Sequence, residues 1–143
     1  MDNNLKSFTH FMEKREEVAQ SYVCGDPVPL VNIATLVSPA TFFDPRGYVV
    51  QQAADDVSRT YQQGAKAFKT GSETHFEILH MAASDSIAYW VGFQHATVHM
   101  NESKDPCPMY LRVTEIFRRE DNEWKLIHRH ADGAQQPSLT QST

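Results

Sequence analysis

Two carboxylates occupy positions in the sequence that could support acid/base chemistry. Asp44 begins the turn-like segment DPRG, and Glu115 lies in a strand-like stretch between Val113 and Phe117. An isolated ionised carboxylate is costly to bury, so Glu115 must either pair with a cation, for which Arg129 is the candidate, or keep its proton. An ionised carboxylate beside a protonated one can act as base and acid at a single pH. Asp44 is therefore a candidate base and Glu115 a candidate acid. The alternative for Asp44 is a turn carboxylate that accepts hydrogen bonds from the backbone.

Histidines offer a second kind of chemistry. His128, His130 and Asp132 alternate along one strand-like stretch, and His95 and His99 do so along another. Zinc needs three or four such ligands around one point. Because short motifs often match without binding anything, we expect neither a metal nor another cofactor.

His95 is a candidate for a second acid/base group. It alternates with Val91 and Phe93, so we expect it to share their face of the sheet and to point into the interior. An imidazole titrates near neutral pH and can transfer protons there. The alternative is a buried histidine whose hydrogen bonds are satisfied within the core.

The elements that must position these residues follow from hydrophobic periodicity. Three- and four-residue steps predict an amphipathic helix whose apolar stripe contains Phe8, Phe11, Met12, Arg15, Val18, Ala19 and Tyr22. A short helix is predicted near residues 27–34 and a third helix near residues 50–65, with a short strand at 40–43 between them. Beyond Gly71 the period changes to two, which predicts strands near residues 73–83, 87–100, 109–120 and 123–131. Helices first and an antiparallel sheet second is the α+β class.

The register of the last hairpin decides which face Glu115 occupies. A two-residue turn would place Glu115 opposite His128, whereas a three-residue turn pairing Arg119 with Glu123 would place it opposite Ile127. The asparagine of the turn tolerates the left-handed conformation, which favours the three-residue form. The more apolar face of this hairpin is then expected to turn toward the helices.

The two faces of the hairpin predict different roles. The inner face is expected to carry Met109, Leu111, Val113, Glu115, Phe117, Ile127, Arg129 and Ala131. The outer face is expected to carry Tyr110, Arg112, Thr114, Ile116, Trp124, Leu126, His128, His130 and Asp132. Aromatic and arginine side chains on an exposed sheet are typical of interfaces. We therefore expect a homodimer through Tyr110, Arg112, Trp124, His128 and His130.

Length and composition exclude several classes of protein. The chain of 143 residues suits one domain over 1–143, with frayed ends at about 1–6 and 134–143. The net charge of -5 and the lack of a Lys/Arg run disfavour nucleic-acid and anionic-membrane partners. Without a signal peptide, a long apolar run or paired cysteines, a cytoplasmic protein is expected.

Two stretches carry a resemblance to a known family. The segment ATFFDPRG after the second predicted helix and the closing RREDNEWKLIHRHADG, in a chain with helices before strands, resemble the nuclear-transport-factor-2-like superfamily. That superfamily includes SnoaL-like cyclases, ketosteroid isomerases, dehydratases and the association domain of calmodulin-dependent kinases. The resemblance implies a cone-shaped, cystatin-like fold in which about three helices pack on a strongly curved sheet around a pocket. ATFFDP is similar to the isomerase segment that carries an acid at the position of Asp44, and EIFR is similar to the strand that carries a second acid at the position of Glu115.

The resemblance also implies a ligand pocket and three competing functions. The expected pocket residues are Tyr22, Phe42, Tyr48, Tyr61, Val91, Phe93, Val113, Phe117 and Arg129. The protein is expected to be a small-molecule enzyme of the isomerase, cyclase or dehydratase type, a non-catalytic protein that binds a small hydrophobic carbonyl compound, or an association module. Whether it is catalytic does not follow from the sequence.

Overall fold

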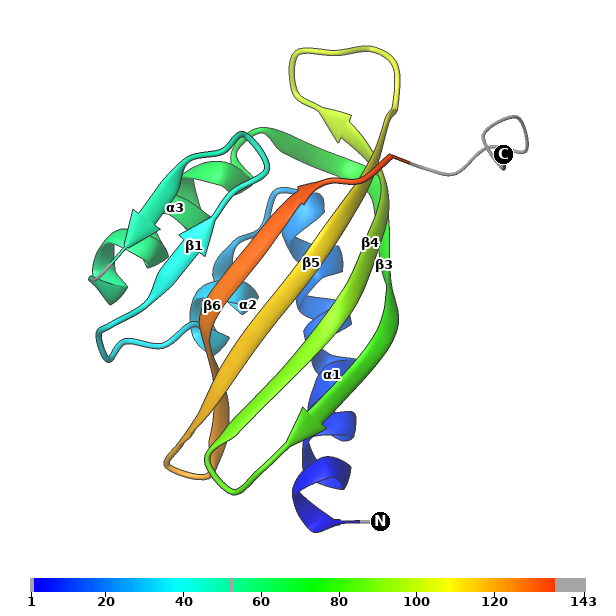
Figure 1. Ribbon diagram of the computed structural model, residues 1–143. Helices are drawn as coiled ribbons and strands as arrows, with labels where there is room; N and C mark the ends of the chain where they lie inside the picture. The colour runs from blue at the N-terminus through cyan, green and yellow to red at the C-terminus, as the bar shows by residue number, and fades with distance from the viewer. Residues whose placement is uncertain (1, 52, 136–143) are drawn as a thin grey trace.

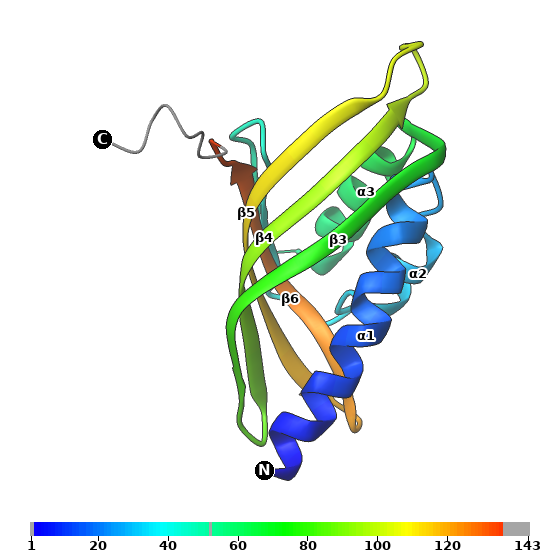
Figure 2. The ribbon, with the colours of Figure 1, turned by 90° about the vertical axis from the view of Figure 1, so that its right-hand side faces the viewer.

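The computed structural model describes residues 2–51 and 53–135. Three helices cover one face of a curved, open, six-stranded sheet (Figures 1 and 2). The helices are α1 (Asn3–Val23), α2 (Val28–Ile33) and α3 (Ala54–Ala65). The strands are β1 (Thr41–Phe43), β2 (Val49–Gln51), β3 (Phe68–Ala83), β4 (Ile87–Met100), β5 (Cys107–Glu120) and β6 (Glu123–Gly133). The sheet order is β2-β1-β6-β5-β4-β3, in which only the β1–β6 pair is parallel. The predicted α+β class is confirmed.

Helix α1 lays its apolar stripe against the concave face of the sheet. The Asp2 side chain caps its first turn by accepting a hydrogen bond from the Asn4 amide at 3.2 Å. The helix ends at Val23, and the chain turns at Gly25, whose φ of +97° is accessible to glycine at little cost. Residues 3–6 are thus helical rather than frayed. At the other end Ala134 still donates to the Tyr110 carbonyl, and residues 136–143 of the predicted tail lie outside the described part of the chain.

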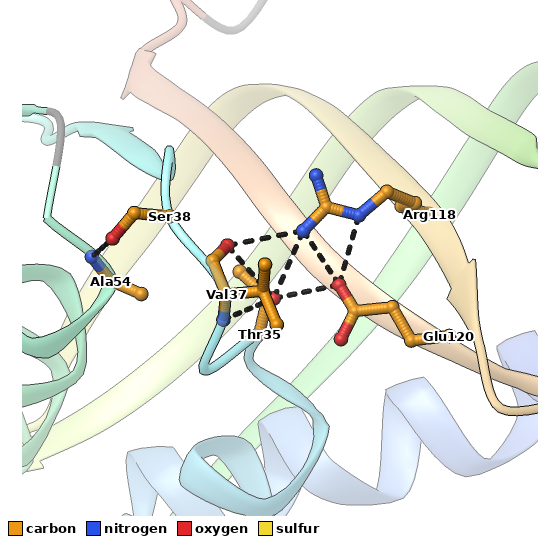
Figure 3. A network of polar contacts seen from close by, with 6 residues as sticks. All are labelled: Thr35, Val37, Ser38, Ala54, Arg118 and Glu120. Carbon is orange, nitrogen blue, oxygen red and sulfur yellow. Dashed lines mark hydrogen bonds and ion pairs between the residues drawn. The ribbon is translucent and has the colours of Figure 1, made fainter.

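Helix α3 begins later than its periodicity predicts. Residues 50 and 51, expected to open the helix, instead belong to β2, which pairs antiparallel with β1. The Ser38 hydroxyl accepts the Ala54 amide at 2.9 Å and so satisfies one amide of the first helical turn (Figure 3). The helix buries Val57 and Tyr61 against the core.

A polar network fastens the segment before β1 to the sheet (Figure 3). The Thr35 hydroxyl donates to Glu120 at 2.7 Å, and Arg118 pairs with the same carboxylate while donating to the Val37 carbonyl. These contacts hold the α2–β1 connection over the end of β5. They precede the parallel pairing of β1 with β6, which places residues Thr41–Phe43 of the segment ATFFDPRG in the sheet as the strand next to β6.

The turn of the last hairpin differs from the expected one. Glu120 pairs with Glu123 across a two-residue turn in which Asp121 and Asn122 have φ of 50° and 66°. Two positive φ values are the signature of the type I′ turn, whose twist matches that of the flanking strands. The predicted three-residue turn is therefore wrong.

A bulge in β6 sets the faces of this hairpin. Phe117 pairs with Leu126, but Ile116 pairs with His128, so one extra residue of β6 is accommodated between them. Glu115 consequently lies opposite Arg129 and not opposite Ile127 or His128.

The expected outer position of Trp124 and Leu126 is also wrong. Both side chains are buried on the helix-covered side. The Trp124 indole nitrogen donates to the Ser7 hydroxyl at 3.1 Å, and its ring contacts Phe8 edge-on at 5.6 Å between centroids. Trp124 is therefore part of the contact between α1 and the sheet and is not available to a partner.

Candidate functional site

Glu115 is the centre of a fully buried polar cluster. Its Oε1 accepts hydrogen bonds from Arg15 Nε at 2.9 Å and Trp90 Nε1 at 2.8 Å. Its Oε2 accepts from Arg15 Nη2 and Arg129 Nη1, each at 2.7 Å. The side chain has no exposed surface. All the lone pairs of this carboxylate are thereby used.

The electrostatics of the cluster keep Glu115 ionised. Burial by itself would raise the pKa of this carboxyl, but the charges and hydrogen bonds of Arg15 and Arg129 outweigh burial and lower its pKa to about 2. Of the two alternatives predicted for Glu115, the structure therefore has the ion pair and not the protonated acid.

Four elements, α1, β4, β5 and β6, converge to build this cluster. Glu115 on β5 lies between Trp90 of β4 and Arg129 of β6 as its cross-strand neighbours. Arg15 reaches it from the buried stripe of α1, where its guanidinium also lies 5.2 Å from the centroid of the Phe76 ring. Sequence reasoning missed the contacts of Arg15 and Trp90. The available signal was an arginine within an otherwise apolar helical stripe, in a chain that also buries a glutamate.

A chain of hydrogen bonds leads from the cluster toward an open hollow. Arg129 Nη2 donates to Gln94 Oε1 at 2.7 Å, and Gln94 Nε2 donates to the Thr74 hydroxyl at 3.0 Å. Thr74 lines a hollow of about 870 Å³ whose lining also includes Gln20 of α1 and Met109 of β5. The hollow itself does not include Glu115, so this polar chain is the link between the two.

Two buried donors on the helices have no partner among the described residues. These are Arg15 Nη1 and the Tyr61 hydroxyl, both buried. The Tyr61 ring packs on Phe42 with 4.9 Å between centroids, and burial raises the pKa of its phenol above the ordinary value, with Arg129 acting in the opposite direction. Buried donors without a partner are rare in native proteins and call for an explanation. The other buried unpaired donors belong to Arg119, which instead stacks over the Trp124 ring at 4.3 Å.

Asp44 has the geometry of the turn carboxylate. Its Oδ1 accepts the backbone amides of Arg46 and Tyr48 at 3.0 and 2.9 Å, and its Oδ2 accepts Arg46 Nε and Nη2 at 3.1 and 2.7 Å. Burial raises its pKa, but the hydrogen bonds from Arg46 and Tyr48 outweigh burial and leave the pKa below the ordinary value. Asp44 and Glu115 share no hydrogen-bond partner within residues 2–51 and 53–135.

His95 lies on the opposite face of the sheet from the one expected. Its Nε2 contacts Glu77 Oε1 at 2.9 Å, and its ring stacks between His75 and Tyr110, with 4.7 Å between centroids on each side. The inner positions of β4 belong to its neighbour Gln94 and to the other even-numbered residues. The prediction that His95 points into the cone is therefore wrong.

The predicted pocket residues divide into four groups. Val113, Phe117 and Tyr61 are buried in the core, Arg129 joins the Glu115 cluster, and Tyr22 and Phe42 are partly buried against it. Burial raises the pKa of Tyr22 to about 12 in spite of the nearby charges of Arg129 and Arg46. Tyr48 is exposed, and Val91 and Phe93 lie on the outer face with His95, so the structure does not bring these three into the cone.

The outer face also carries His128 and His130. His128 Nδ1 lies 2.6 Å from the Thr41 hydroxyl, and Phe43 contacts the rings of both His128 and His130. Arg112 pairs with Asp132 in a bidentate contact. Within the described residues no group of three or more His, Cys, Asp or Glu side chains has the arrangement of a metal site. The described helices include none long and apolar enough to span a bilayer.

Comparison with known proteins gives the family and the fold. The model of the SnoaL-like domain matches residues 33–132, while no curated protein matches the sequence. A nuclear transport factor 2 (NTF2)-like superfamily protein from Salmonella enterica serovar Typhimurium superposes with a TM-score of 0.71 at 13% identity, over 96% of this chain and 98% of that chain. A candidate calcium/calmodulin-dependent kinase II association domain from Xanthomonas campestris gives 0.68 at 10% identity, over 95% and 91%. A candidate dehydratase of the NTF2-like family from Streptomyces avermitilis gives 0.61 at 16% identity, over 81% and 87%.

These identities show the fold alone, and at that level the predicted resemblance to the NTF2-like superfamily is confirmed. The family model covers more than half of the chain, including Asp44 and Glu115. The protein belongs to the SnoaL-like domain family.

Proposed function

We propose that the protein binds a small, largely apolar molecule between the helices and the concave face of the sheet, without acid/base catalysis by its carboxylates. The observation that carries this proposal is the buried Glu115 cluster, in which donors outnumber the acceptors available to them. A core that is only structural is often as stable, or more stable, with apolar side chains in place of a buried ion pair. Arg15 Nη1 and the Tyr61 hydroxyl, buried without partners in the described chain, support a role in holding a further group.

The hydrogen-bond chain from the surface supports access to this site. Thr74 lies in the wall of the 870 Å³ hollow and is joined through Gln94 to Arg129. Met109, in the same wall, packs against the hydrophobic core. The lining also includes Glu73, His75 and His95, so a ligand entering from the hollow would meet a mixed polar and apolar wall before the charged cluster.

An isomerase, cyclase or dehydratase acting on a hydrophobic carbonyl compound is the alternative. The Streptomyces avermitilis protein is named as a candidate dehydratase, and the same fold supports many different chemistries. A proton transfer between Asp44 and Glu115 would need one of them to hold a proton at neutral pH. Their pKa values are both lowered and their oxygens are occupied by arginine or backbone donors, so binding fits the geometry better.

Native mass spectrometry of the purified protein, with a thermal-shift screen of small neutral and anionic carbonyl compounds, tests the proposal. We expect a bound mass, or a melting temperature that rises with ligand concentration because the ligand binds the folded state. Bound compounds should be recovered chemically unchanged after long incubation. A library with no binder and no copurified mass would overturn the binding function. If the wild type converts a ligand and Asp44→Asn does not, the enzyme alternative would be supported instead.

We also propose a homodimer formed through the outer sheet face, with Trp124 removed from the predicted contact set. Leu79 on this face is 56% exposed, and with Val91 and Phe93 it lines a shallow hollow of about 380 Å³. Exposed apolar side chains gathered beside polar ones are typical of interfaces. The double variant Phe93→Glu, Tyr110→Glu should sediment as a monomer at micromolar concentration while the wild type sediments as a dimer. A variant that stays dimeric would place the interface elsewhere.

A further inference from the structure

Strand β3 forms one edge of the sheet, and no further strand of the described chain lies beyond it (Figure 1). An edge strand presents a row of unpaired N–H and C=O groups with which another chain can pair. Side chains of α1 occupy the first part of this row. Gln20 Nε2 donates to the Ser72 carbonyl at 2.8 Å, and Gln20 Oε1 accepts the Thr74 amide at 3.0 Å. One side-chain amide thus takes the place that a peptide group of a neighbouring strand would have.

This cover of the edge by α1 ends at Phe76. Glu16, one helical turn before Gln20, accepts the Phe76 amide on Oε2 at 2.8 Å. The next residue at this spacing on α1 is Met12, whose side chain is buried in the apolar core and whose sulfur is a weak acceptor. The described hydrogen bonds from α1 to the edge therefore end at Phe76, and the helix leaves the backbone of residues 78–83 uncovered.

The backbone of Ile78 also faces away from β4. In an antiparallel pair, residues that bond to the neighbouring strand alternate with residues whose backbone groups face the other way. Thr74 and Phe76 send their amides to α1, so Ile78 continues the outward-facing set. Leu79 is then the extra residue of a bulge. The side chains of Ile78 and Leu79 are 39% and 56% exposed, which places two apolar groups at the middle of the uncovered edge.

Beyond the bulge the outward backbone groups are those of Met81 and Ala83. Ser84 donates to the Ile87 carbonyl at 2.8 Å across the turn, so these two residues are a hydrogen-bonded pair. Alternation back along β3 then places Ala83 and Met81 in the outward-facing set. Together with Ile78 they offer a short row of backbone groups to an added strand.

The uncovered edge has carboxylates at both ends. Glu77 lies at one end, and Asp85 is exposed in the turn at the other. Glu16, which holds the amide next to Glu77 in the chain, adds a second carboxylate at the first end. Residues 78–83 themselves contain no carboxylate, lysine or arginine. Arg118, opposite the first residue of β4, is already held by a carboxylate. The edge is therefore apolar in the middle and acidic at its ends.

A second copy of this chain fits the edge poorly. Antiparallel pairing of residues 78–83 with their own copy would bring Asp85 opposite Phe76 and next to Glu77, so like charges would meet at both ends. The bulge at Leu79 also bends the edge, and a bent edge pairs badly with the edge of another folded sheet. A flexible peptide can follow the bend, and basic residues at its ends would meet the carboxylates.

We propose that residues 78–83 of β3 bind an extended peptide of a partner protein, apolar in the middle and with lysine or arginine at its ends, as an added edge strand. Its backbone pairs with the outward groups of Ile78, Met81 and Ala83, and its apolar side chains cover Ile78 and Leu79. In this mode of recognition the main-chain hydrogen bonds supply affinity and the alternate side chains supply specificity. The surface is separate from the Glu115 cluster, so the proposal is independent of the small-molecule site.

Synthetic peptides of equal length test the proposal by fluorescence polarisation. The probe is the capped, fluorescein-labelled peptide KKVTVTVKK. The control EEVTVTVEE reverses the charges at the ends, and the control KKVTPTVKK keeps them but interrupts the strand with a proline that cannot donate a hydrogen bond. We expect the probe to bind saturably and each control to bind at least about tenfold more weakly.

Hydrogen exchange of the backbone amides locates the bound probe. The amides of residues 78–83 should exchange more slowly when the probe is bound, because an added strand protects them. Protection confined to the outer sheet face or to the helices would overturn the assignment. Slow exchange of residues 78–83 in the free protein that strengthens with protein concentration would assign the edge to a second copy and overturn it as well.

The variant Ala83→Pro removes one outward amide. Proline is tolerated in an edge strand where the amide faces solvent, so the melting temperature should stay near that of the wild type. Loss of one hydrogen bond should weaken binding of the probe about three- to tenfold.

The variant Asp85→Asn removes a charge at one end of the edge and should weaken binding of the probe, most strongly at low salt. Asp121→Asn is the matched control, since it changes the net charge equally in the exposed turn between β5 and β6, and it should bind the probe like the wild type. If Ala83→Pro unfolds the protein, Asp85→Asn and hydrogen exchange still decide. A probe that binds no more tightly than the two control peptides, or equally well to the wild type and to Asp85→Asn, would overturn the strand-addition site.

Discussion

Replacement of Glu115 by glutamine removes the charge at the centre of the cluster while keeping the shape of the side chain. Two buried guanidinium groups then lose their counter-ion. The pKa of Glu115 is about 2 in the folded protein against an ordinary value of 4.5, a difference of about 2.5 pKa units (4.5 − 2). At about 1.4 kcal/mol per unit this corresponds to about 3 kcal/mol of stability near neutral pH. Removal of one partner from a buried ion pair costs a similar amount, about 3–5 kcal/mol.

The pH dependence of this loss has a defined sign. Because the folded-state pKa lies below the unfolded one, the stabilisation is complete above the ordinary value of 4.5 and is lost as the pH falls toward about 2. Urea unfolding near neutrality should therefore show Glu115→Gln to be about 3 kcal/mol less stable than the wild type, with the gap closing in acid. Asp56→Asn, which breaks the exposed pair with Arg59, is the control and should cost less than about 1 kcal/mol. A deficit for Glu115→Gln below about 1 kcal/mol, or one that acid leaves unchanged, would refute the reasoning.

Three further substitutions test the fold around the site. Gly92→Ala would place a Cβ 2.0 Å from the Glu77 carbonyl oxygen at the bulge of β3. Thermal denaturation should therefore show a loss of stability of about 3 kcal/mol or more. A melting temperature near that of the wild type would contradict this close approach. Asp44→Ala removes the acceptor of two backbone amides in its turn and should cost about 1–2 kcal/mol in urea unfolding, whereas an undiminished midpoint would show that the turn holds without them. Trp124→Phe loses the hydrogen bond to Ser7 and should cost about 1 kcal/mol or more, while leaving the sedimentation coefficient unchanged because Trp124 faces α1 and not a partner.

The types of most elements could be predicted from the sequence. Which of the two alternating sets of side chains in β4 faces the helices could not. Both alternating sets of β4 contain large side chains, Trp90 in one and Val91 and Phe93 in the other. Gln94 makes the even-numbered set look the more polar, which favours the wrong face by hydrophobicity alone. The structure places Trp90 inside because its indole nitrogen and the guanidinium groups together satisfy Glu115. Where two faces are similarly apolar, the hydrogen-bonding needs of one buried charge decide between them.

Sequence reasoning placed Glu115 on the inner face and named Arg129 as its candidate cation, but it left open whether Glu115 would keep its proton. The predicted three-residue turn would place Glu115 opposite Ile127, whereas the bulge brings Arg129 directly opposite. The second partner, Arg15, is 100 residues distant in the sequence, and its presence on an apolar stripe was visible without indicating what it contacts. Local periodicity can show which face of an element is buried, but it carries no information on which distant side chain completes a charge pair.

The bulge at Ile127 determines the kind of site that the cone contains. The two-residue turn alone, continued without a bulge, would pair Glu115 with His128, an imidazole that titrates near neutral pH. One extra residue replaces this partner with Arg129, whose charge does not depend on pH in that range. The same residue keeps Trp124 and Leu126 against α1 while moving His128 to the outer face. Both charge partners of Glu115, Arg15 and Arg129, therefore stay charged across neutral pH, and a carboxylate held by two permanent charges suits a fixed ion pair better than the exchange of a proton.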